Sequence, residues 1–293
     1  MAVEERDPHS GYMTTGHEWN GIKELNRPVP KVIWAFLAIT ALFSVVYWVL
    51  MPAWPLVDSY TKGILGSDQR AMLEEDLREA AVGRAAWVQR VEDMEFSQIR
   101  ADEALMGRVR QTGRTLFEDN CAVCHDLRGE GGGGYPRLSD DAWLWGGEPA
   151  AIMETLRVGI NSAHPETRFA QMQGFGRDGV LSRDEILSVV AFVQSRAGVE
   201  PEGGAGPQAL GAGAEVFAAN CAACHGEDGG GNVELGAPNL TDDFWIFGGD
   251  RGSLYATIFE GRQGHMPHWD GRLSILERKI LTLFVLDLGE GRR

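Results

Sequence analysis

Two copies of one short motif hold every cysteine of this chain. Each motif has two cysteines separated by two residues and followed directly by a histidine, from Cys121 to His125 and from Cys221 to His225. The chain has 4 cysteines in 293 residues, so none is left outside the motifs. This spacing is typical of covalent c-type haem attachment, in which both thiols bond the haem and the histidine binds its iron. The sequence therefore predicts two haem c groups, attached through Cys121, Cys124, Cys221 and Cys224.

Paired cysteines also occur in other kinds of site. A structural disulfide pair, a four-thiolate zinc site and a thioredoxin-like redox motif all use two closely spaced thiols. None of these three alternatives accounts for a histidine directly after both pairs. The haem interpretation explains all six residues at once, so we favour it.

A run of 20 residues without a charge, from Val32 to Met51, precedes the motifs. As a helix this run is about 30 Å long, which is the thickness of a bilayer core. Aromatic residues lie near both of its ends, as in membrane-spanning helices. A cleaved signal peptide would need a shorter leader and small residues at its exit, where this chain has Met51, Pro52 and Trp54. The sequence predicts a permanent single-pass transmembrane helix over residues 32–51, in contact with a lipid membrane.

Two observations predict the orientation of this helix. The leader, residues 1–31, carries Lys23, Arg27 and Lys31 close to the helix, whereas only Lys62 and Arg70 lie at a similar distance beyond it. Basic residues favour the cytoplasmic side. In addition, haem is attached to such motifs outside the bacterial cytoplasm. We therefore expect a cytoplasmic leader, a bacterial inner-membrane anchor and periplasmic haem domains.

The net charge of the chain is −15. Without the leader's 4 basic and 5 acidic residues, the totals of 27 and 42 become 23 and 37, a net charge of −14. This acidic balance argues against a nucleic-acid partner and favours docking of a basic protein.

The sequence around the motifs is also repeated. Residues 113–121 parallel residues 213–221, a glycine-rich loop follows each motif, and residues 140–147 match residues 242–249. Each copy ends in a predicted amphipathic helix, over residues 183–196 and 275–288. We expect Gly113 and Gly213 to let the first helix of each copy approach the last one, with Phe192 and Phe284 in the core.

The predicted helices and the repeat together predict an all-α chain. Its parts are a leader (1–31), a transmembrane helix (32–51), a periplasmic helical connector (52–107), one haem domain (108–199), a linker (200–207) and a second haem domain (208–293). The connector is charged, and Leu73, Leu77, Trp87, Val91 and Met94 are spaced for one helix face.

The two repeated regions resemble class I cytochrome c domains. The resemblance implies that His125 and His225 are proximal iron ligands, each donating its other ring nitrogen to a backbone carbonyl, that of Pro136 or Pro238. It also implies a methionine as the sixth ligand, on a loop before the last helix of the domain. We expect Met172 for the first haem, in preference to Met153 within a predicted helix, and Met266 for the second. His265 and His268 flank Met266 and are alternative ligands.

The leader adds a more specific resemblance. Residues 14–30 are similar to the leader of subunit III of cbb3-type cytochrome c oxidases, and residues 60–66 are similar to the same family's stretch after the helix. The chain departs from the family at Asn20, where Asp is usual, and at Gln173, where Pro is usual. The second departure bears on the assignment of Met172.

The resemblance implies an electron-transfer subunit without an oxygen-reducing site of its own. Electrons from a periplasmic or membrane cytochrome c would pass over the two haems to a monohaem subunit and then to the haem–copper catalytic subunit. A dihaem peroxidase would need one iron with an open sixth position, which Met172 and Met266 argue against. A free membrane electron shuttle, or the cytochrome subunit of a periplasmic dehydrogenase, fits the anchor and haems but not the leader.

Overall fold

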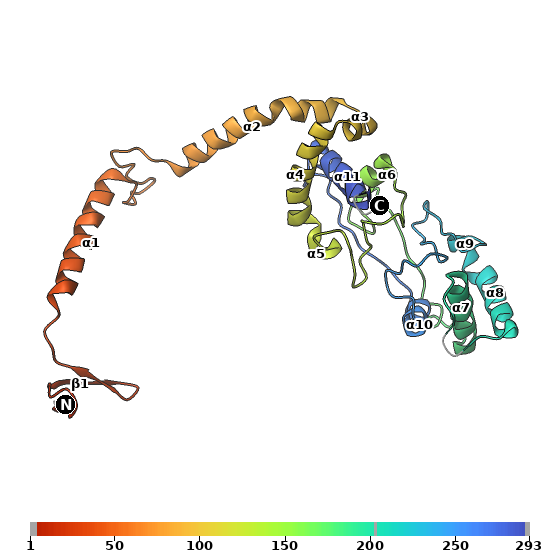
Figure 1. Cartoon of the computed structure of the whole chain (residues 1–293), viewed down its shortest axis with the longest axis horizontal. Coiled ribbons are helices and arrows are strands. Elements are labelled where there is room, and N and C mark those ends of the chain that lie inside the picture. The colour runs from red at the N-terminus through yellow and green to blue at the C-terminus, as the bar shows by residue number, and fades with distance from the viewer. Residues whose placement is uncertain (1–4, 202–203, 291–293) are drawn as a thin grey trace. The chain divides into compact units, whose positions relative to one another are not determined.

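The computed structural model describes residues 5–201 and 204–290. Residues 1–4 of the predicted leader, residues 202–203 of the predicted linker and the last three residues of the second predicted domain lie outside this range. The chain forms two compact units, residues 1–83 and residues 84–293 (Figure 1).

A β-hairpin forms the leader in the first unit. Strand β1 (Thr14–Trp19) pairs with the antiparallel strand β2 (Ile22–Leu25). The connecting residues Asn20 and Gly21 have φ values of 50° and 84°, as a tight two-residue hairpin turn requires. This hairpin is an addition to the predicted all-α fold. Asn-Gly between alternating residues was the sequence signal for it.

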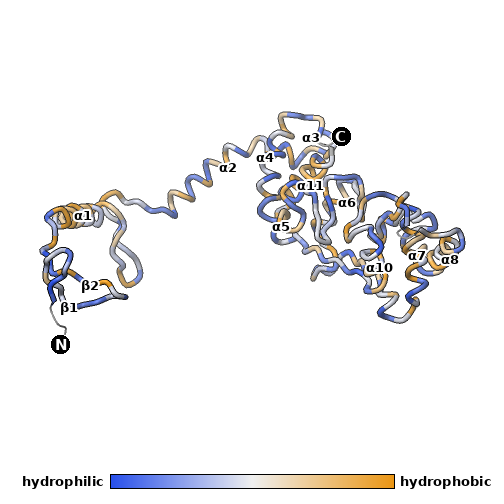
Figure 2. The backbone as a smooth tube through the Cα atoms, turned by 60° about the horizontal axis from the view of Figure 1, so that its bottom comes forward, coloured by the Kyte–Doolittle hydropathy of each residue, from blue (hydrophilic) through white to orange (hydrophobic). Residues whose placement is uncertain are grey.

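Helix α1 (Lys31–Leu50) lies within one residue of the predicted transmembrane span at each end. None of its side chains is buried in the structure, although nearly all are apolar. Figure 2 shows it as hydrophobic along its length. A helix of this length and composition can cross a membrane. Its unburied apolar side chains are suited to contact with lipid.

Helix α2 (Gln69–Asp93) begins in the first unit and ends in the second. Of the predicted apolar face, Leu73 and Leu77 are exposed and Val91 is fully buried. Val91 lies in a cluster with residues of α3 (Phe96–Ala101), α4 (Glu103–Asn120) and α11 (Ile275–Glu290). The apolar face of the connector therefore packs on protein only in its last part.

The predicted helices of the haem regions are confirmed. Each motif forms a short helix, α5 (Ala122–His125) and α9 (Ala222–His225). They follow α4 and α8 (Pro207–Asn220), respectively. Further along the two copies lie α6 (Pro149–Val158) and α10 (Arg251–Glu260), and α7 (Arg183–Arg196) and α11 close them.

The two copies exchange their last helices. Helix α4 packs on α11, and α8 packs on α7, as Figure 1 also shows. Phe284 lies over Gly113, where an added Cβ would come within 2.7 Å of its Cβ atom. Phe192 lies over Gly213 in the same way, at 2.8 Å. The expectation that each copy packs its first helix on its own last helix is therefore wrong.

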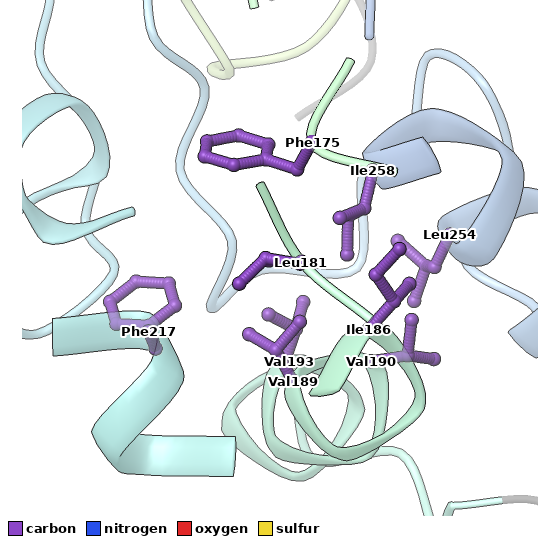
Figure 3. Close-up of a cluster of buried hydrophobic side chains, with 9 residues drawn as sticks. All are labelled: Phe175, Leu181, Ile186, Val189, Val190, Val193, Phe217, Leu254 and Ile258. Carbon is purple, nitrogen blue, oxygen red and sulfur yellow. The ribbon is translucent and has the colours of Figure 1, made fainter. Parts of the chain in front are cut away.

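The short connection between α7 and α8 explains this exchange. Only residues 197–206 join the two helices, and helices joined by a short connection normally lie side by side. Figure 3 shows the result: Val189, Val190 and Val193 of α7 surround the same core as Phe217 of α8 and Leu254 of α10. The glycine and phenylalanine repeats fit either pairing, so the connection decides between them.

We call the two resulting bodies the first and the second half. The first half contains α4, α5, α6 and α11, and the second half contains α8, α9, α10 and α7. Each half has one haem motif and one apolar core, built from both sequence copies. The aromatic pairs Phe117–Phe284 and Phe192–Phe217, with ring centroids 5.6 and 5.3 Å apart, lie at the two equivalent interfaces.

Candidate functional site

Both haem motifs have the same backbone turn. Cys121 ends α4, and its carbonyl accepts hydrogen bonds from the N–H groups of Cys124 and His125, at 3.1 and 3.0 Å. Cys221 does the same in the second motif, at 3.1 and 2.9 Å. All four thiols are free. One turn of helix thus brings each pair of sulfur atoms together with the following imidazole, which is the arrangement that haem c attachment needs.

Each histidine of the motifs is held by a proline carbonyl. His125 Nδ1 lies 3.0 Å from the oxygen of Pro136, and His225 Nδ1 lies 3.0 Å from the oxygen of Pro238. The predicted partners are confirmed. With Nδ1 as the hydrogen-bond donor, the lone pair of Nε2 is free for a metal.

Burial keeps these groups uncharged. It lowers the pKa of His125 and of His225, so both imidazoles are neutral, as an iron ligand must be. Burial also raises the pKa of the Cys121 and Cys221 thiols to about 11. Haem attachment converts each thiol into a thioether, which carries no charge. An apolar environment around the Cys121 and Cys221 sulfur atoms is therefore compatible with the attached state.

The glycine-rich loops position the proline carbonyls. Gly131 has a φ of +64°, and its N–H donates to the oxygen of His125 at 2.9 Å. A Cβ atom on Gly131 would come within 2.7 Å of the backbone of Pro136. Gly231 has the same role beside Pro238, with a φ of +84°. The loop therefore needs glycine here for its conformation and for the close approach.

The two loop methionines lie in the halves opposite to their sequence copies. Met266 packs against the core of the first half, the same core against which Cys121 packs. Met172 packs against the core of the second half, the same core against which Cys221 packs. This packing differs from the expected pairing of Met172 with the first motif and Met266 with the second. The cause is the exchange of the last helices. Each methionine loop is followed directly by a last helix, α7 after Met172 and α11 after Met266, so it lies in the same half as that helix.

Short backbone pairings fix both loops. The N–H groups of Met266 and Ile160 each donate to the other's carbonyl, at 2.9 Å in both directions. Met172 and Arg262 are paired in the same way, at 2.8 and 2.9 Å. The Met266 loop is thus hydrogen-bonded to the segment that follows α6 in the first half. The Met172 loop is hydrogen-bonded to the segment that follows α10 in the second half.

A glycine at each crossing makes this pairing possible. Gly159 has a φ of +68°, and a Cβ atom there would lie 2.5 Å from the oxygen of Met266. Gly261 has a φ of +77°, and its Cβ atom would lie 2.7 Å from the carbonyl carbon of Gln173. The sequence patterns described above did not include these two glycines. Each directly follows the equivalent helix of its copy, α6 or α10, and this repeat could have identified them.

The alternative ligands have other contacts. Met153 lies on α6, and its sulfur is 3.8 Å from the hydroxyl of the fully buried Thr282 on α11, as for a methionine between packed helices. His265 is exposed, and its Nδ1 lies 2.9 Å from the oxygen of Asn161. The ring of His268 packs edge-on against His164, with centroids 5.5 Å apart.

Several buried polar atoms without a hydrogen-bond partner test whether the first half fits a haem. Trp269 is 6% exposed, its indole Nε1 has no partner, and it shares a cluster with Cys121 and Met266. The Arg168 Nε is also buried without an acceptor. Haem propionates are acceptors that would satisfy such donors. In the second half Phe175 stands at the position of Trp269, three residues after the methionine. The residues present therefore fit the predicted group, with a polar difference between the halves.

The equivalent acidic pairs of the two copies lie at one cleft. Asp140 and Asp141 line it together with Asp242 and Asp243, in a volume of about 470 Å³. Burial raises the pKa of Asp140. The described residues contain no group of three or more His, Cys, Asp or Glu side chains placed to hold a metal ion. This cleft marks where corresponding surfaces of the two haem regions meet.

Three known protein families match separate parts of the chain. Residues 11–58 match the family described as the N-terminal domain of cytochrome oxidase-cbb3, FixP. Residues 111–197 match the cytochrome c family, and residues 208–285 match the family described as cytochrome C oxidase, cbb3-type, subunit III. The leader and both haem regions are thus recognised separately.

Full-length relatives agree with these matches. The chain is 42% identical to the cbb3-type cytochrome c oxidase subunit FixP of Bradyrhizobium diazoefficiens, over 98% of both chains. It is 44% identical to that of Azorhizobium caulinodans, over 98% of this chain and 96% of the relative. It is 41% identical to subunit CcoP of Azospirillum sp. over the whole of both chains.

The fold, the site and the comparisons lead to one assignment. The predicted all-α fold, with one candidate transmembrane helix and two cytochrome c regions, is confirmed. The two cytochrome c regions of this chain imply two covalently bound haem c groups. Helix α1 makes the chain membrane-anchored. This chain belongs to the CcoP/FixP family of cbb3-type cytochrome c oxidase subunits.

Proposed function

We propose that this chain carries electrons from a cytochrome c to the catalytic core of a cbb3-type oxidase. The donor is a periplasmic or membrane cytochrome c, and the acceptor is a monohaem subunit that passes electrons to the haem–copper subunit. Oxygen is reduced in that haem–copper subunit, outside this chain. The leader match carries this proposal furthest, because dihaem cytochromes of other functions share the haem motifs but not the leader.

The proposed haem ligands follow the exchanged halves. Cys121 and Cys124 bind the first haem, with His125 and Met266 on its iron. Cys221 and Cys224 bind the second, with His225 and Met172 on its iron. This crosswise assignment is supported by packing, because Met266 and Cys121 pack on one core and Met172 and Cys221 on the other. Each half then uses a proximal histidine from one sequence copy and a methionine from the other.

The bound haems supply one-electron transfer, in which no bond of the protein is made or broken. The residues of this chain keep the site rigid and dry. The Pro136 and Pro238 carbonyls fix the imidazoles, and the buried cores that include Phe117 and Phe217 exclude water. Rigid coordination favours fast transfer, since little needs to rearrange when an electron arrives.

The orientation is part of the proposal. Lys23, Arg27 and Lys31 beside α1 favour a cytoplasmic leader. The haem regions are then periplasmic and face soluble cytochromes with a net charge of −14, counted over residues 32–293. Charge of one sign increases the association rate of a basic donor, in a way that added salt weakens.

Purification of the tagged full-length chain in mild detergent tests the proposal. We expect the haem–copper subunit and the monohaem subunit to co-purify, and the preparation to consume oxygen with reduced cytochrome c as donor. A variant in which residues 14–25 are replaced by a Gly/Ser linker of equal length keeps the haems and tests the role of the leader. Isolation of the chain alone would favour a free shuttle, and isolation with a dehydrogenase would favour the cytochrome subunit of that enzyme. Peroxide turnover by the isolated chain would favour a dihaem peroxidase.

A further inference from the structure

The segment after α1 folds back onto the end of that helix. Ile64 and Leu65 donate their backbone N–H groups to the oxygens of Val49 and Leu50, both at 3.0 Å. The N–H of Met51 donates to the oxygen of Tyr47 at 2.8 Å. The last carbonyls of a helix have no partner within the helix. Here the chain itself supplies donors to three of them, so the end of α1 has little need of water.

Further contacts give this fold-back segment, residues 52–66, a defined shape. The N–H of Thr61 donates to the oxygen of Trp54 at 2.9 Å, and the N–H of Trp54 donates to the Thr61 hydroxyl at 3.0 Å. Gly63 has a φ of +68°, and a Cβ atom there would lie 2.6 Å from the carbonyl carbon of Leu50. The return of the chain to α1 therefore depends on a glycine at this position.

The fold-back segment turns apolar side chains outward. Val57 is 99% exposed, Ile64 75% and Leu65 64%. Leu56, Trp54 and Tyr60 are each about half exposed. The Trp54 ring packs on Trp48 of α1, with centroids 4.9 Å apart, which makes the segment continuous with the surface of the helix. Asp58 and Lys62 carry its two charges, which balance.

We propose that the fold-back segment is a membrane-interface cap that lies at the boundary between lipid headgroups and acyl chains. Its surface continues that of α1, whose side chains are all unburied and which is long and apolar enough to cross the bilayer. Tryptophan and tyrosine favour this boundary. The backbone hydrogen bonds from Ile64 and Leu65 to the end of α1 reduce the number of polar groups that would need water at this boundary. Lys62 can extend its ammonium group towards water from such a depth. The cap thus adds lipid contact beyond the 20 residues of the helix.

Spin labels on single added cysteines test the cap. All four natural cysteines lie in the haem motifs, so a new cysteine is labelled alone once the haems are attached. The variants are Val57→Cys, Ile64→Cys and Leu65→Cys, with Gln69→Cys at the start of α2 as the matched exposed control. The labelled full-length chain is placed in vesicles of phosphatidylethanolamine and phosphatidylglycerol. The collision rates of each label with oxygen, which enters lipid, and with a water-soluble nickel chelate are then measured.

We expect oxygen collisions to exceed nickel collisions at positions 57, 64 and 65, and the reverse at position 69. Nickel collisions at all four positions would place the segment in water and overturn the proposal. Labels shielded from both reagents would mean that protein covers the segment, which also overturns it. A further variant, Gly63→Val, should raise the nickel collision rate at position 64 several-fold, because the return to α1 is then blocked. The test does not depend on the oxidase, so its failure leaves the proposed electron transfer unaffected.

Discussion

Phe284, close to the C-terminus, packs directly over Gly113 on the helix that leads into the first haem motif. The separation is so short that a Cβ atom on Gly113 would lie 2.7 Å from the Cβ of Phe284. The first haem site is therefore closed by the last helix of the chain. Phe192 and Gly213 make the reciprocal contact, so neither haem region is complete without the other.

This interdependence predicts the result of cutting the connection between α7 and α8. A protease site is inserted after Gly204, which is exposed. After cleavage, we expect the C-terminal fragment with the second haem motif to stay on the membrane, because α11 remains packed on α4 and α6. Its release should require denaturant. The measurement is haem staining of the membrane and soluble fractions.

The control is the same protease site inserted after Gly66, before α2 begins. Cleavage there should release both haem regions together as one soluble piece. Two independent tandem domains would behave differently, since a cut after Gly204 would then free the second haem alone. That outcome would contradict the exchange of helices.

Lys279 of α11 predicts a second effect, on the connector. Its ammonium group donates to the oxygens of Glu92 and Met94 at the end of α2, at 3.1 and 2.7 Å. A cation at this end also interacts favourably with the helix dipole. Lys279→Met keeps the length of the side chain and removes the charge. We expect a loss of about 1–3 kcal/mol from the docking of this segment and faster tryptic cleavage at Arg90 and Arg100.

Lys279→Arg is the control, because it keeps a donor and a positive charge at the same place. Its cleavage rate should stay close to that of the parent chain. If Lys279→Met is cleaved no faster than Lys279→Arg, the two carbonyl contacts contribute nothing to the docking of the connector.

Asp102 makes the stability of the connector depend on pH. The hydrogen bond from the backbone N–H of Leu105, at 3.0 Å, is the largest cause that holds the pKa of Asp102 below its ordinary value, and Arg90 lowers it further. A carboxyl whose pKa is lower in the folded state stabilises the fold above its unfolded pKa of about 3.9, and this contribution is lost as the pH falls through the folded pKa. Asp102→Ala should lower the Tm by about 2–4 °C at pH 7.

The difference between Asp102→Ala and the parent chain should fade as the pH falls below about 4, as followed by thermal unfolding. Asp102→Asn keeps an acceptor for the helix end and should lose less at pH 7. A Tm deficit of Asp102→Ala that is the same at pH 7 and at the lowest pH would exclude a role for the carboxylate charge.

The sequence predicted local features well and the pairing of the two copies wrongly. The helices, the haem motifs and the Pro136 and Pro238 partners depend on neighbouring residues, so they follow from short patterns. The choice between α7 and α11 as the partner of α4 is not local. Each of these two helices carries a phenylalanine that can pack over a glycine. Only the short connection between α7 and α8 distinguishes the two possible pairings. The missed hairpin had a clear signal in Asn20 and Gly21.

The crossing glycines predict a reciprocal effect on the two haems. Gly159→Ala places a methyl group against the oxygen of Met266, so we expect it to disturb the first haem, which shares the half with Met266. Gly261→Ala should disturb the second haem through Met172. An axial methionine gives oxidised haem a weak near-infrared band, in which charge moves from sulfur to iron. Each substitution should weaken this band by up to half, because it disturbs one of the two methionines. Gly264→Ala, in the same loop as Met266 but with open space around it, should leave the band unchanged. Equal effects of Gly264→Ala and Gly159→Ala would mean that the close approach is irrelevant.

The crosswise ligands can be tested by marking one haem. Cys121→Ala leaves that haem with a single thioether bond and a free vinyl group, which moves its reduced absorption band to longer wavelength. A redox titration at the shifted band then follows the first haem alone. In this background we expect Met266→Leu to lower the potential of the marked haem, because a thioether ligand favours the reduced iron. A tenfold change in the equilibrium corresponds to about 59 mV for one electron.

Met172→Leu in the Cys121→Ala background should leave the marked potential unchanged and lower that of the other haem. The mirror experiment uses Cys221→Ala, where Met172→Leu should shift the marked haem and Met266→Leu should not. The two backgrounds together separate a ligand from a residue that merely stabilises the fold, since a general loss of stability would move both haems in both backgrounds. If Met172→Leu shifts the haem marked by Cys121→Ala, each copy supplies its own methionine, and the packing of Met266 on the same core as Cys121 does not report its ligation.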